Sequence, residues 1–280
     1  MSVDRPSRRP AGLPVPALLQ AAHAAPTVGV TTLSALLCLA VGLPPEPTAV
    51  LVAAVLTGQL SIGWSNDLVD LARDRAAGRR DKPLVSGTLS VAVVRRACAV
   101  AVSLSLLLSA LLGWRAGATH LLVVGGGWAY NLGLKRTAWS WLPYAVAFGA
   151  LACVPSLAAT TSGAGVAWWL PVTGALLGVG AHLLNVLPDL DDDHRTGVRG
   201  LPHRIADRAG APMVARLAVV VLVAATAILV GVVATSPAVL LGCAAVAALA
   251  AVVLTGSGRG PFLAAMGIAL VDVVLLAVSL

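Results

Sequence analysis

The chain has 280 residues, of which 58% are hydrophobic and 11% are charged, and its formal net charge is +7. A typical soluble domain is about 45–50% apolar and about 25% charged, so this composition excludes an ordinary soluble enzyme, a disordered protein and a disulfide scaffold. Nucleic acid is an improbable partner, since the basic residues stand in short loops and only two Phe and two Tyr could stack on bases. The composition predicts an all-α membrane protein.

Residues 1–15 are basic and proline-rich, and we expect them to form a cytoplasmic tail ahead of a single domain of residues 16–280. The apolar runs of this domain lack period-2 alternation, which favours helices over a barrel. They predict nine transmembrane helices, at about residues 16–42, 48–65, 89–113, 117–134, 139–160, 166–187, 212–234, 237–255 and 261–280.

The basic residues predict the orientation of these spans. With nine crossings, every Lys and Arg except Arg115 falls on the side of the N-terminus. Cytoplasmic loops carry an excess of Lys and Arg, so this side is expected to face the cytoplasm. The chain is therefore expected to be an integral, multi-pass protein of the plasma membrane, surrounded by membrane lipids.

Two polar segments repeat each other at an offset of 119 residues. Each has the pattern N-x3-D-x3-D-x3-G, formed by Asn66, Asp70, Asp74 and Gly78 and again by Asn185, Asp189, Asp193 and Gly197. The offset corresponds to four predicted spans, so both copies keep the same orientation. We therefore expect a pseudo-duplicated bundle in which both segments face one cytoplasmic cavity.

Residues at i, i+4 and i+8 form a slowly drifting stripe on one helix face. So many carboxylates would repel one another in a low-dielectric setting unless a cation joined them, and hard oxygen ligands suit Mg²⁺. Mg²⁺ commonly binds one or two carboxylates together with substrate phosphates, which points to a diphosphate held between the segments. The candidate metal ligands are Asn66, Asp67, Asp70, Asp74, Asn185, Asp189 and Asp193.

At these residues the chain resembles the UbiA superfamily of intramembrane prenyltransferases. The first signature of that family, NDxxDxxxD, is complete from Asn66 to Asp74, and KPLVSGTLS from Lys82 to Ser90 is similar to its R/K-P-L-x-S-G segment. NVLPDLDDDHRTG, residues 185–197, resembles the second signature, and YNLGLKR, residues 130–136, is similar to the family's Tyr/Lys motif.

The resemblance implies a UbiA-type bundle with a cavity open to the cytoplasm and a lateral tunnel for an isoprenoid tail. It implies Mg²⁺-dependent transfer of a prenyl group from a prenyl diphosphate to a small aromatic or lipophilic acceptor. The implied catalytic residues are Asp67, Asp70, Asp74, Asp189 and Asp193. The candidates for binding the diphosphate are Arg79, Lys82, Lys135, Arg199 and Tyr130.

Other functions share parts of this pattern. A membrane terpene cyclase would ionise the same diphosphate without an acceptor, and a cation transporter could use carboxylates as ion ligands. A transporter would place them near the bilayer midplane, whereas these lie at span ends. A CDP-alcohol phosphotransferase needs a D-G-x2-A-R sequence that is missing here. His182 is more simply a hydrogen-bonded helix residue than a base, and Asp272 in the last span has no assigned role.

Overall fold

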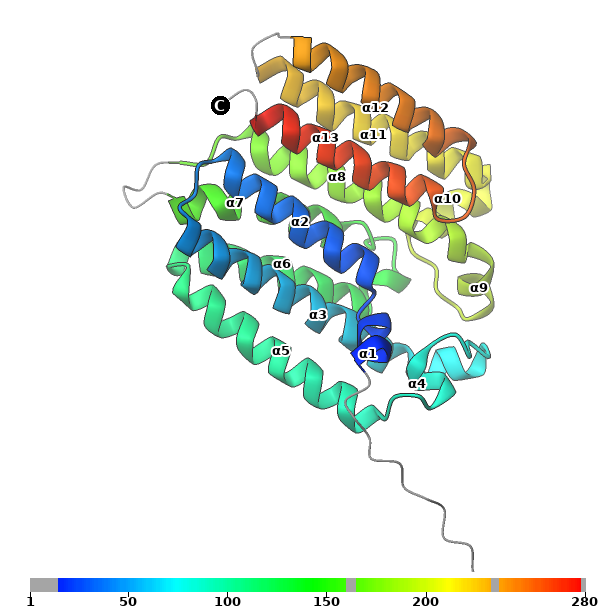
Figure 1. The fold of residues 1–280 in the computed structure, drawn as a ribbon. Coiled ribbons are helices and arrows are strands. Elements are labelled where there is room, and N and C mark those ends of the chain that lie inside the picture. Colours follow the sequence, from blue (N-terminus) through cyan, green and yellow to red (C-terminus); the bar gives the residue numbers. More distant parts are fainter. Residues whose placement is uncertain (1–14, 160–164, 233–236, 278–280) are drawn as a thin grey trace, which may run out of the picture.

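The computed structural model describes residues 15–159, 165–232 and 237–277, without the side chain of residue 191. The predicted tail thus lies outside the described residues, apart from Val15 at the start of the first helix. The described residues form helices and no strand (Figure 1), which confirms the all-helical prediction.

Nine long helices build the bundle within the described ranges. They are α2 (Ala24–Ala40), α3 (Pro45–Ala76), α5 (Val91–Leu111), α6 (Trp114–Leu132), α7 (Leu142–Ala159), α8 (Trp169–Val186), α11 (Ala211–Val232), α12 (Pro237–Thr255) and α13 (Gly260–Ala277). Short helices α1 (Val15–Ala21), α4 (Pro83–Ser86), α9 (Leu190–Arg195) and α10 (Leu201–Ala209), with the 3₁₀ turns η1 (Leu134–Arg136) and η2 (Leu187–Asp189), connect them.

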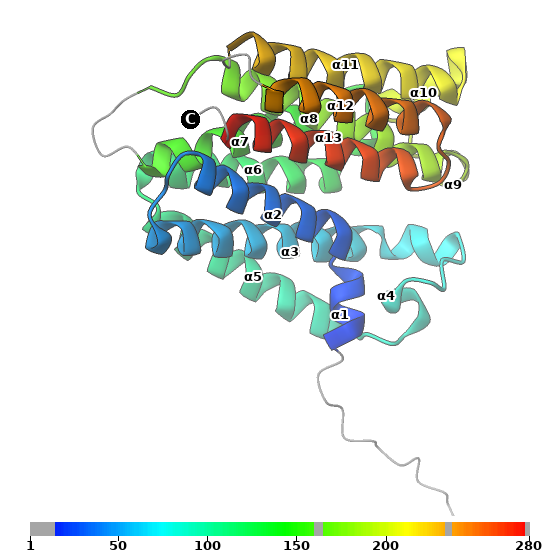
Figure 2. The ribbon, with the colours of Figure 1, turned by 45° about the horizontal axis from the view of Figure 1, so that its top comes forward.

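The long helices pack as a closed ring. Each helix contacts the next along the chain, and α2 packs against α13, which joins the two ends of the series. Both ribbon views place α11, α12 and α13 on one side, α3 and α5 on the other, and α2 between them (Figures 1 and 2).

The helices of the two halves start at corresponding positions. The starts of α2 and α7 are 118 residues apart, those of α3 and α8 are 124 apart, those of α5 and α11 are 120 apart, and those of α6 and α12 are 123 apart. These separations match the offset of the repeated acidic pattern. The duplication therefore extends from the motif to the helices that carry it.

Seven of these helices are long and apolar enough to cross a membrane, and the bent pair α1 and α2 would be an eighth. α6 does not meet this criterion, so the count of nine spans stays a prediction. The outer surface agrees with a lipid environment, because leucines of α5 such as Leu106, Leu107 and Leu111 are exposed. Such residues would be costly to hydrate in water but suit contact with acyl chains.

The first predicted span differs from the structure. Residues 16–42 do not form one helix, because α1 and α2 meet at 77° around His23. His23 has φ 54°, and Pro26 follows in the first turn of α2, where it has no N–H to offer Ala22. The hydroxyl of Thr27 donates to the Ala22 carbonyl instead, at 2.9 Å. The straight helix therefore begins only at Ala24.

Close helix contacts position α7 and α8 against each other. A Cβ at Gly178 would lie 2.5 Å from the carbonyl oxygen of Tyr144, and one at Gly174 would lie 2.6 Å from that of Phe148. Small residues at such crossings let two backbones approach closely in a membrane. This approach brings the end of α8, with the second acidic segment, beside the start of α7.

Candidate active site

Three carboxylates line one face of α3 near its C-terminal end. Asp67, Asp70 and Asp74 are only 3%, 1% and 3% exposed, although α3 here extends beyond its apolar run. Their i, i+3, i+7 spacing places them on the same side of the helix. Burying three negative charges together is very costly unless cations pair with them.

Lys135 supplies one of these cations from the turn after α6. Its ammonium donates to both carboxylate oxygens of Asp70 at 2.6 Å and to Asn66 Oδ1 at 3.3 Å. Burial lowers the pKa of Lys135, although the charge of Asp70 acts in the opposite direction. The nearby carboxylate of Asp70 therefore stabilises the charged form of Lys135 against the effect of burial.

Lys82 supplies a second cation at the start of α4. Its Nζ lies 3.0 Å from Asp67 Oδ1 and 2.7 Å from Asp74 Oδ2. Burial alone would lower the pKa of Lys82, but the two carboxylates outweigh it and hold the pKa above its usual 10.5. Lys82 therefore remains charged and ties the loop after α3 to the acidic face.

The second acidic segment has a different local structure. The predicted stripe on one continuous helix is wrong here, because α8 ends at Val186 and the 3₁₀ turn η2 precedes α9. Pro188 explains the break, since it cannot donate the helical hydrogen bond to Leu184. The carboxylates are also more accessible than those of α3, with side-chain exposures of 54% for Asp189 and 19% for Asp193.

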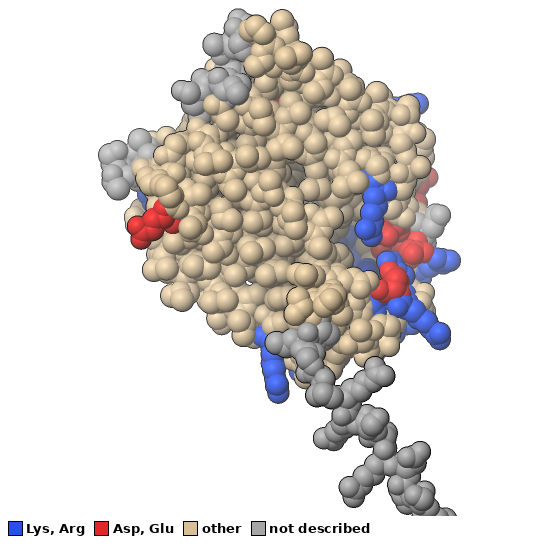
Figure 3. Space-filling view, in the orientation of Figure 1, with Lys and Arg blue, Asp and Glu red and all other residues tan. Residues whose placement is uncertain are grey.

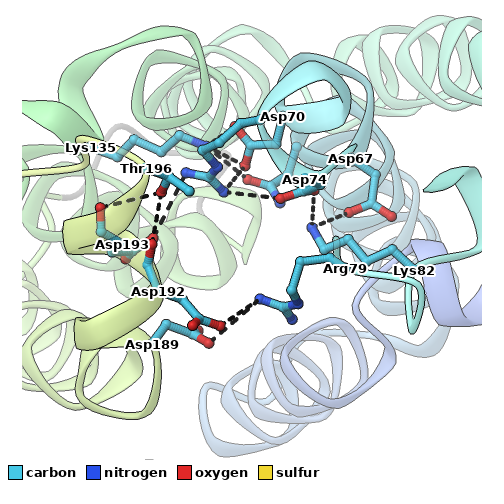
Figure 4. A network of polar contacts seen from close by, with 12 residues as sticks. Asp67, Asp70, Asp74, Arg79, Lys82, Lys135, Asp189, Asp192, Asp193 and Thr196 are labelled. Atoms are coloured by element: carbon cyan, nitrogen blue, oxygen red, sulfur yellow. Dashed lines mark hydrogen bonds and ion pairs between the residues drawn. The ribbon is translucent and has the colours of Figure 1, made fainter. Parts of the chain in front are cut away.

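Arg73 in the first segment and Arg79 just after it reach the second segment, and Figure 4 shows Arg79 pointing towards Asp189 and Asp192. Arg73 Nη2 lies 2.8 Å from Asp70 Oδ2, while its Nη1 lies 3.9 Å from Asp193 Oδ1. Arg79 Nη1 lies 4.0 Å from Asp189 Oδ1 and 3.7 Å from Asp192 Oδ2. A single guanidinium thus spans the gap between the two segments, so they converge on one site as the repeat predicted.

Arg79 also pairs with Asp81, two residues further along the chain. Its Nε and Nη2 donate to the two oxygens of Asp81 at 3.1 Å each, a bidentate pair. The pKa of Asp81 is lowered mainly by this hydrogen bond, and the pKa of Arg79 is raised by it. The pair holds Arg79 at the rim of the site, facing the second segment.

Two histidines outside the sequence motifs also reach the carboxylates. His23 Nε2 lies 3.2 Å from Asp67 Oδ1, and buried His203 Nε2 lies 3.1 Å from Asp193 Oδ2. A histidine that hydrogen-bonds a carboxylate fixes its orientation. The left-handed backbone of His23 is the kind of strained geometry that is kept where the surroundings require it.

An aromatic cluster lies beside the second segment. Tyr130 contacts Tyr144 and His182 edge to face, with ring centroids 5.2 Å and 5.6 Å apart. Asn185 Nδ2 donates to the hydroxyl of Tyr144 at 3.3 Å, so Asn185 contacts an aromatic hydroxyl in addition to being a candidate metal ligand. Tyr130 thus packs within this cluster, among rings that could shield a developing cation.

His182 is fixed by a relay from the loop after the second segment. The backbone N–H of Leu201 donates to Ser140 Oγ at 2.8 Å, and Ser140 Oγ lies 3.0 Å from His182 Nε2. This agrees with the simpler interpretation of His182 as a hydrogen-bonded helix residue.

Arg199 is not brought to either acidic segment. The side chain of Arg199 is exposed. Its backbone carbonyl oxygen accepts a hydrogen bond from Arg204 Nε at 3.2 Å. None of the ion pairs found between described residues involves Arg199.

A charged cavity opens between the segments at the end of the bundle where the side chains of Lys, Arg, Asp and Glu gather (Figure 3). It has a volume of about 530 Å³. Its lining includes the cations Arg73, Arg136 and Arg195, together with Ala76, Ala77, Asp192 and Thr196. A cavity bordered by three guanidinium groups suits a ligand with several anionic oxygens.

The donor set fits a hard divalent cation bound jointly with such a ligand. Within the part of the chain that is described, no three His, Cys, Asp or Glu side chains are arranged to hold a metal by themselves. Mg²⁺ does not need such a cage, because it keeps waters and takes one or two carboxylates plus phosphate oxygens. The carboxylate oxygens of Asp189 and Asp193, which are partly accessible, meet this requirement.

Comparison with known proteins agrees with the fold. The sequence model of the UbiA prenyltransferase family matches residues 28–271, so the chain belongs to this family. A comparison with curated proteins gave no match.

Solved structures share the fold at low sequence identity. A UbiA homolog from Aeropyrum pernix K1, in its apo form, has a TM-score of 0.70 at 19% identity, covering 90% of this chain and 97% of that one. A UbiA homolog from Archaeoglobus fulgidus bound to GPP and Mg²⁺ has a TM-score of 0.65 at 16% identity, covering 93% and 97%. A solved structure described for digeranylgeranylglyceryl phosphate synthase has a TM-score of 0.64 at 13% identity, covering 95% of this chain and 98% of that one.

Proposed function

We propose that the chain transfers a prenyl group from a prenyl diphosphate to a small aromatic or lipophilic acceptor within the membrane, with Mg²⁺ as cofactor. Membership in a prenyltransferase family supports the general activity. The single observation that carries the proposal is the convergence of the two acidic segments, because the guanidinium of Arg73 contacts both Asp70 and Asp193. The homolog from Archaeoglobus fulgidus, bound in separate structures to GPP or DMAPP with Mg²⁺, supports the class of donor.

The proposed metal ligands are carboxylates and amides of both segments, namely Asn66, Asp67, Asp70, Asp74, Asn185, Asp189 and Asp193. Bound Mg²⁺ would neutralise charge on the departing diphosphate. The proposed partners of the remaining phosphate oxygens are Arg79, Lys82, Lys135, Arg199 and Tyr130, of which Arg199 lies apart from both acidic segments, and we add Arg73. Arg73 is included because it contacts both segments and lines the cavity.

The residues of this chain would help the allylic C–O bond to ionise in two ways. The guanidinium and ammonium groups stabilise the negative charge that develops on the leaving group. The rings of Tyr130 and Tyr144 and the apolar helices beneath them exclude water from the developing cation. A charged mouth above an apolar interior supplies both conditions at once.

We also propose that the N-terminus and the charged cavity face the cytoplasm. The cavity contains arginines, and basic residues collect in cytoplasmic loops. Nine spans would then be formed by the nine long helices, with α6 crossing between its membrane-compatible neighbours α5 and α7.

The test is diphosphate release by the purified protein in detergent. Prenyl diphosphates of C10 to C20 are supplied with membrane lipid extract as the source of acceptor, with Mg²⁺ or with EDTA, and the extracted lipids are analysed by mass spectrometry. We expect Mg²⁺-dependent release together with a prenylated product, and loss of both in Asp70→Asn and Asp189→Asn.

Glu46→Gln is the matched control, because Glu46 lies in the first turn of α3, at the opposite end of the same helix. It should retain full activity. Full activity in both Asp variants would refute the proposal. Release with a cyclic hydrocarbon and no prenylated acceptor would assign the chain to the terpene cyclases instead.

A further inference from the structure

A second, smaller cavity lies among α2, α7, α8 and α13, away from the charged mouth. Its volume is about 60 Å³, and its lining is almost wholly apolar, with leucines such as Leu37 and Leu151 and the ring of Phe148. Two polar side chains interrupt this lining, Asp272 of α13 and Thr173 of α8. They come from two neighbouring helices, because α8 and α13 pack directly against each other.

Both polar residues have oxygen atoms without partners. Asp272 is 3% exposed, and its Oδ2 accepts from the hydroxyl of Thr226 at 3.2 Å. Its other oxygen, Oδ1, and the hydroxyl of Thr173 are buried and have no hydrogen-bond partner among the described residues. Leaving such groups unpaired is costly, so each calls for an explanation.

Thr173 is unusual among the helical threonines. Thr57 and Thr119 lie in α3 and α6, and each donates its hydroxyl to the carbonyl four residues earlier, the common arrangement inside a helix. Thr173 does not use this partner and leaves its hydroxyl at the cavity wall. The free hydroxyl and the free carboxylate oxygen therefore face the same small volume.

The aromatic cluster lies between the charged site and this cavity. Phe148 lines it and stacks on Tyr144, with ring centroids 6.2 Å apart and the ring planes nearly parallel. Thr173 lies twelve residues before Asn185 on α8, which places it about 18 Å from the acidic end of that helix. A lipophilic chain held at the charged mouth would therefore direct its far end towards Asp272 and Thr173.

We propose that this cavity binds a hydroxyl group at the far end of a lipophilic substrate, with Asp272 and Thr173 as its hydrogen-bonding partners. A hydroxyl can donate to Asp272 Oδ1 and accept from Thr173 Oγ1 together, whereas a hydrocarbon end would leave both unpaired. The proposal rests on the proposed function in one respect, namely that the end of the substrate held at the charged cavity is a diphosphate. It therefore narrows the substrate class to chains that carry an oxygen at their distal end.

The test compares chains with and without a terminal hydroxyl. Unreactive sulfur-bridged analogues of C10, C15 and C20 prenyl diphosphates, plain or hydroxylated at the last carbon, are titrated with Mg²⁺ into the purified protein, and binding is measured by thermal shift. A second series uses n-alkanols and the matching alkanes, which carry no diphosphate. We expect the hydroxylated member to bind about tenfold more tightly at one chain length, as a buried hydrogen-bonded pair would give.

The variants Asp272→Leu and Thr173→Val should lose this preference while they still bind the plain analogues, and Asp272→Asn should retain part of it. Ser105→Ala is the control, because the hydroxyl of Ser105 is also buried without a partner but belongs to α5, away from this cavity. It should leave the preference unchanged.

Equal binding of hydroxylated and plain chains at every length, as an ordered water in the cavity would give, would overturn the proposal. So would a preference that survives Asp272→Leu. If the alkanols bind more tightly than the matching alkanes but no diphosphate analogue binds, the proposed prenyl transfer is refuted and the proposed hydroxyl site is supported.

Discussion

Replacing Lys135 with Met removes the closest partner of a buried carboxylate. The ammonium of Lys135 lies 2.6 Å from both oxygens of Asp70, and the two side chains are 5% and 1% exposed. Breaking one side of such a pair typically costs 3–5 kcal/mol, because the other charge stays buried without compensation. Arg73 remains 2.8 Å from Asp70, so we expect a loss of about 3 kcal/mol, near the lower end of that range.

A double-mutant cycle in detergent measures this loss. Thermal unfolding is recorded for Lys135→Met, Asp70→Leu and the double variant, with Arg136→Met as control because Arg136 is the exposed neighbour of Lys135 in η1. The double variant should be more stable than the sum of the single effects predicts, by about 2 kcal/mol. Additive effects, or a Lys135→Met protein as stable as Arg136→Met, would show that the pair does not balance the buried charge.

Three further outcomes are expected. Arg73→Gln should reduce diphosphate release at least about tenfold, since a charge-assisted contact is worth roughly 1.5–3 kcal/mol. Arg75→Gln is the control, because Arg75 is exposed and lies two residues further along α3, and it should not reduce the release. Equal activity of the two variants would contradict the bridging role of Arg73. Gly178→Val should lower the thermal stability sharply, because a Cβ there would meet the carbonyl of Tyr144, and a normal melting profile would show that α7 and α8 need not pack so closely. The pKa of Lys82 is raised above 10.5, so the stability that its ion pairs contribute is fully present from neutral pH up to about pH 10.5 and is lost as the pH rises through the raised pKa. The difference in melting temperature between the wild type and Lys82→Met should therefore be constant from about pH 6 to pH 9, and its disappearance within this range would refute the charge state.

The sequence predicted the helices more closely than the site. Each apolar run predicted from hydropathy overlaps one of the long helices, since a helix that crosses a bilayer needs a minimum length of apolar residues. The prediction failed at His23, where the apolar run continues but the backbone does not, and at Pro188, where the acidic pattern continues through a 3₁₀ turn. In both places a proline that lacks an N–H, within a pattern that hydropathy treats as uniform, accounts for the break.

The partners within the site required the structure. The spacing of Asp67, Asp70 and Asp74 predicted a shared face, and the repeat at residues 185–197 predicted a second face of the same kind. The contacts of His23 with Asp67 and of His203 with Asp193 could not be predicted from the sequence, since a single histidine belongs to no repeated spacing. Arg73 was visible within the first signature, and only its reach to Asp193 distinguished it from its neighbour Arg75.

The sequence by itself determined the membrane setting, the helices, the duplication and the kind of chemistry that the charged groups could perform. These are local properties, because hydropathy, spacing and charge depend on residues close together along the chain. The tertiary structure decided which cations neutralise which carboxylates, how near the two segments come, and that Asp272 and Thr173 share a cavity. Those contacts join residues on different helices, and their geometry depends on how closely the backbones pack, which no pattern within a single segment specifies.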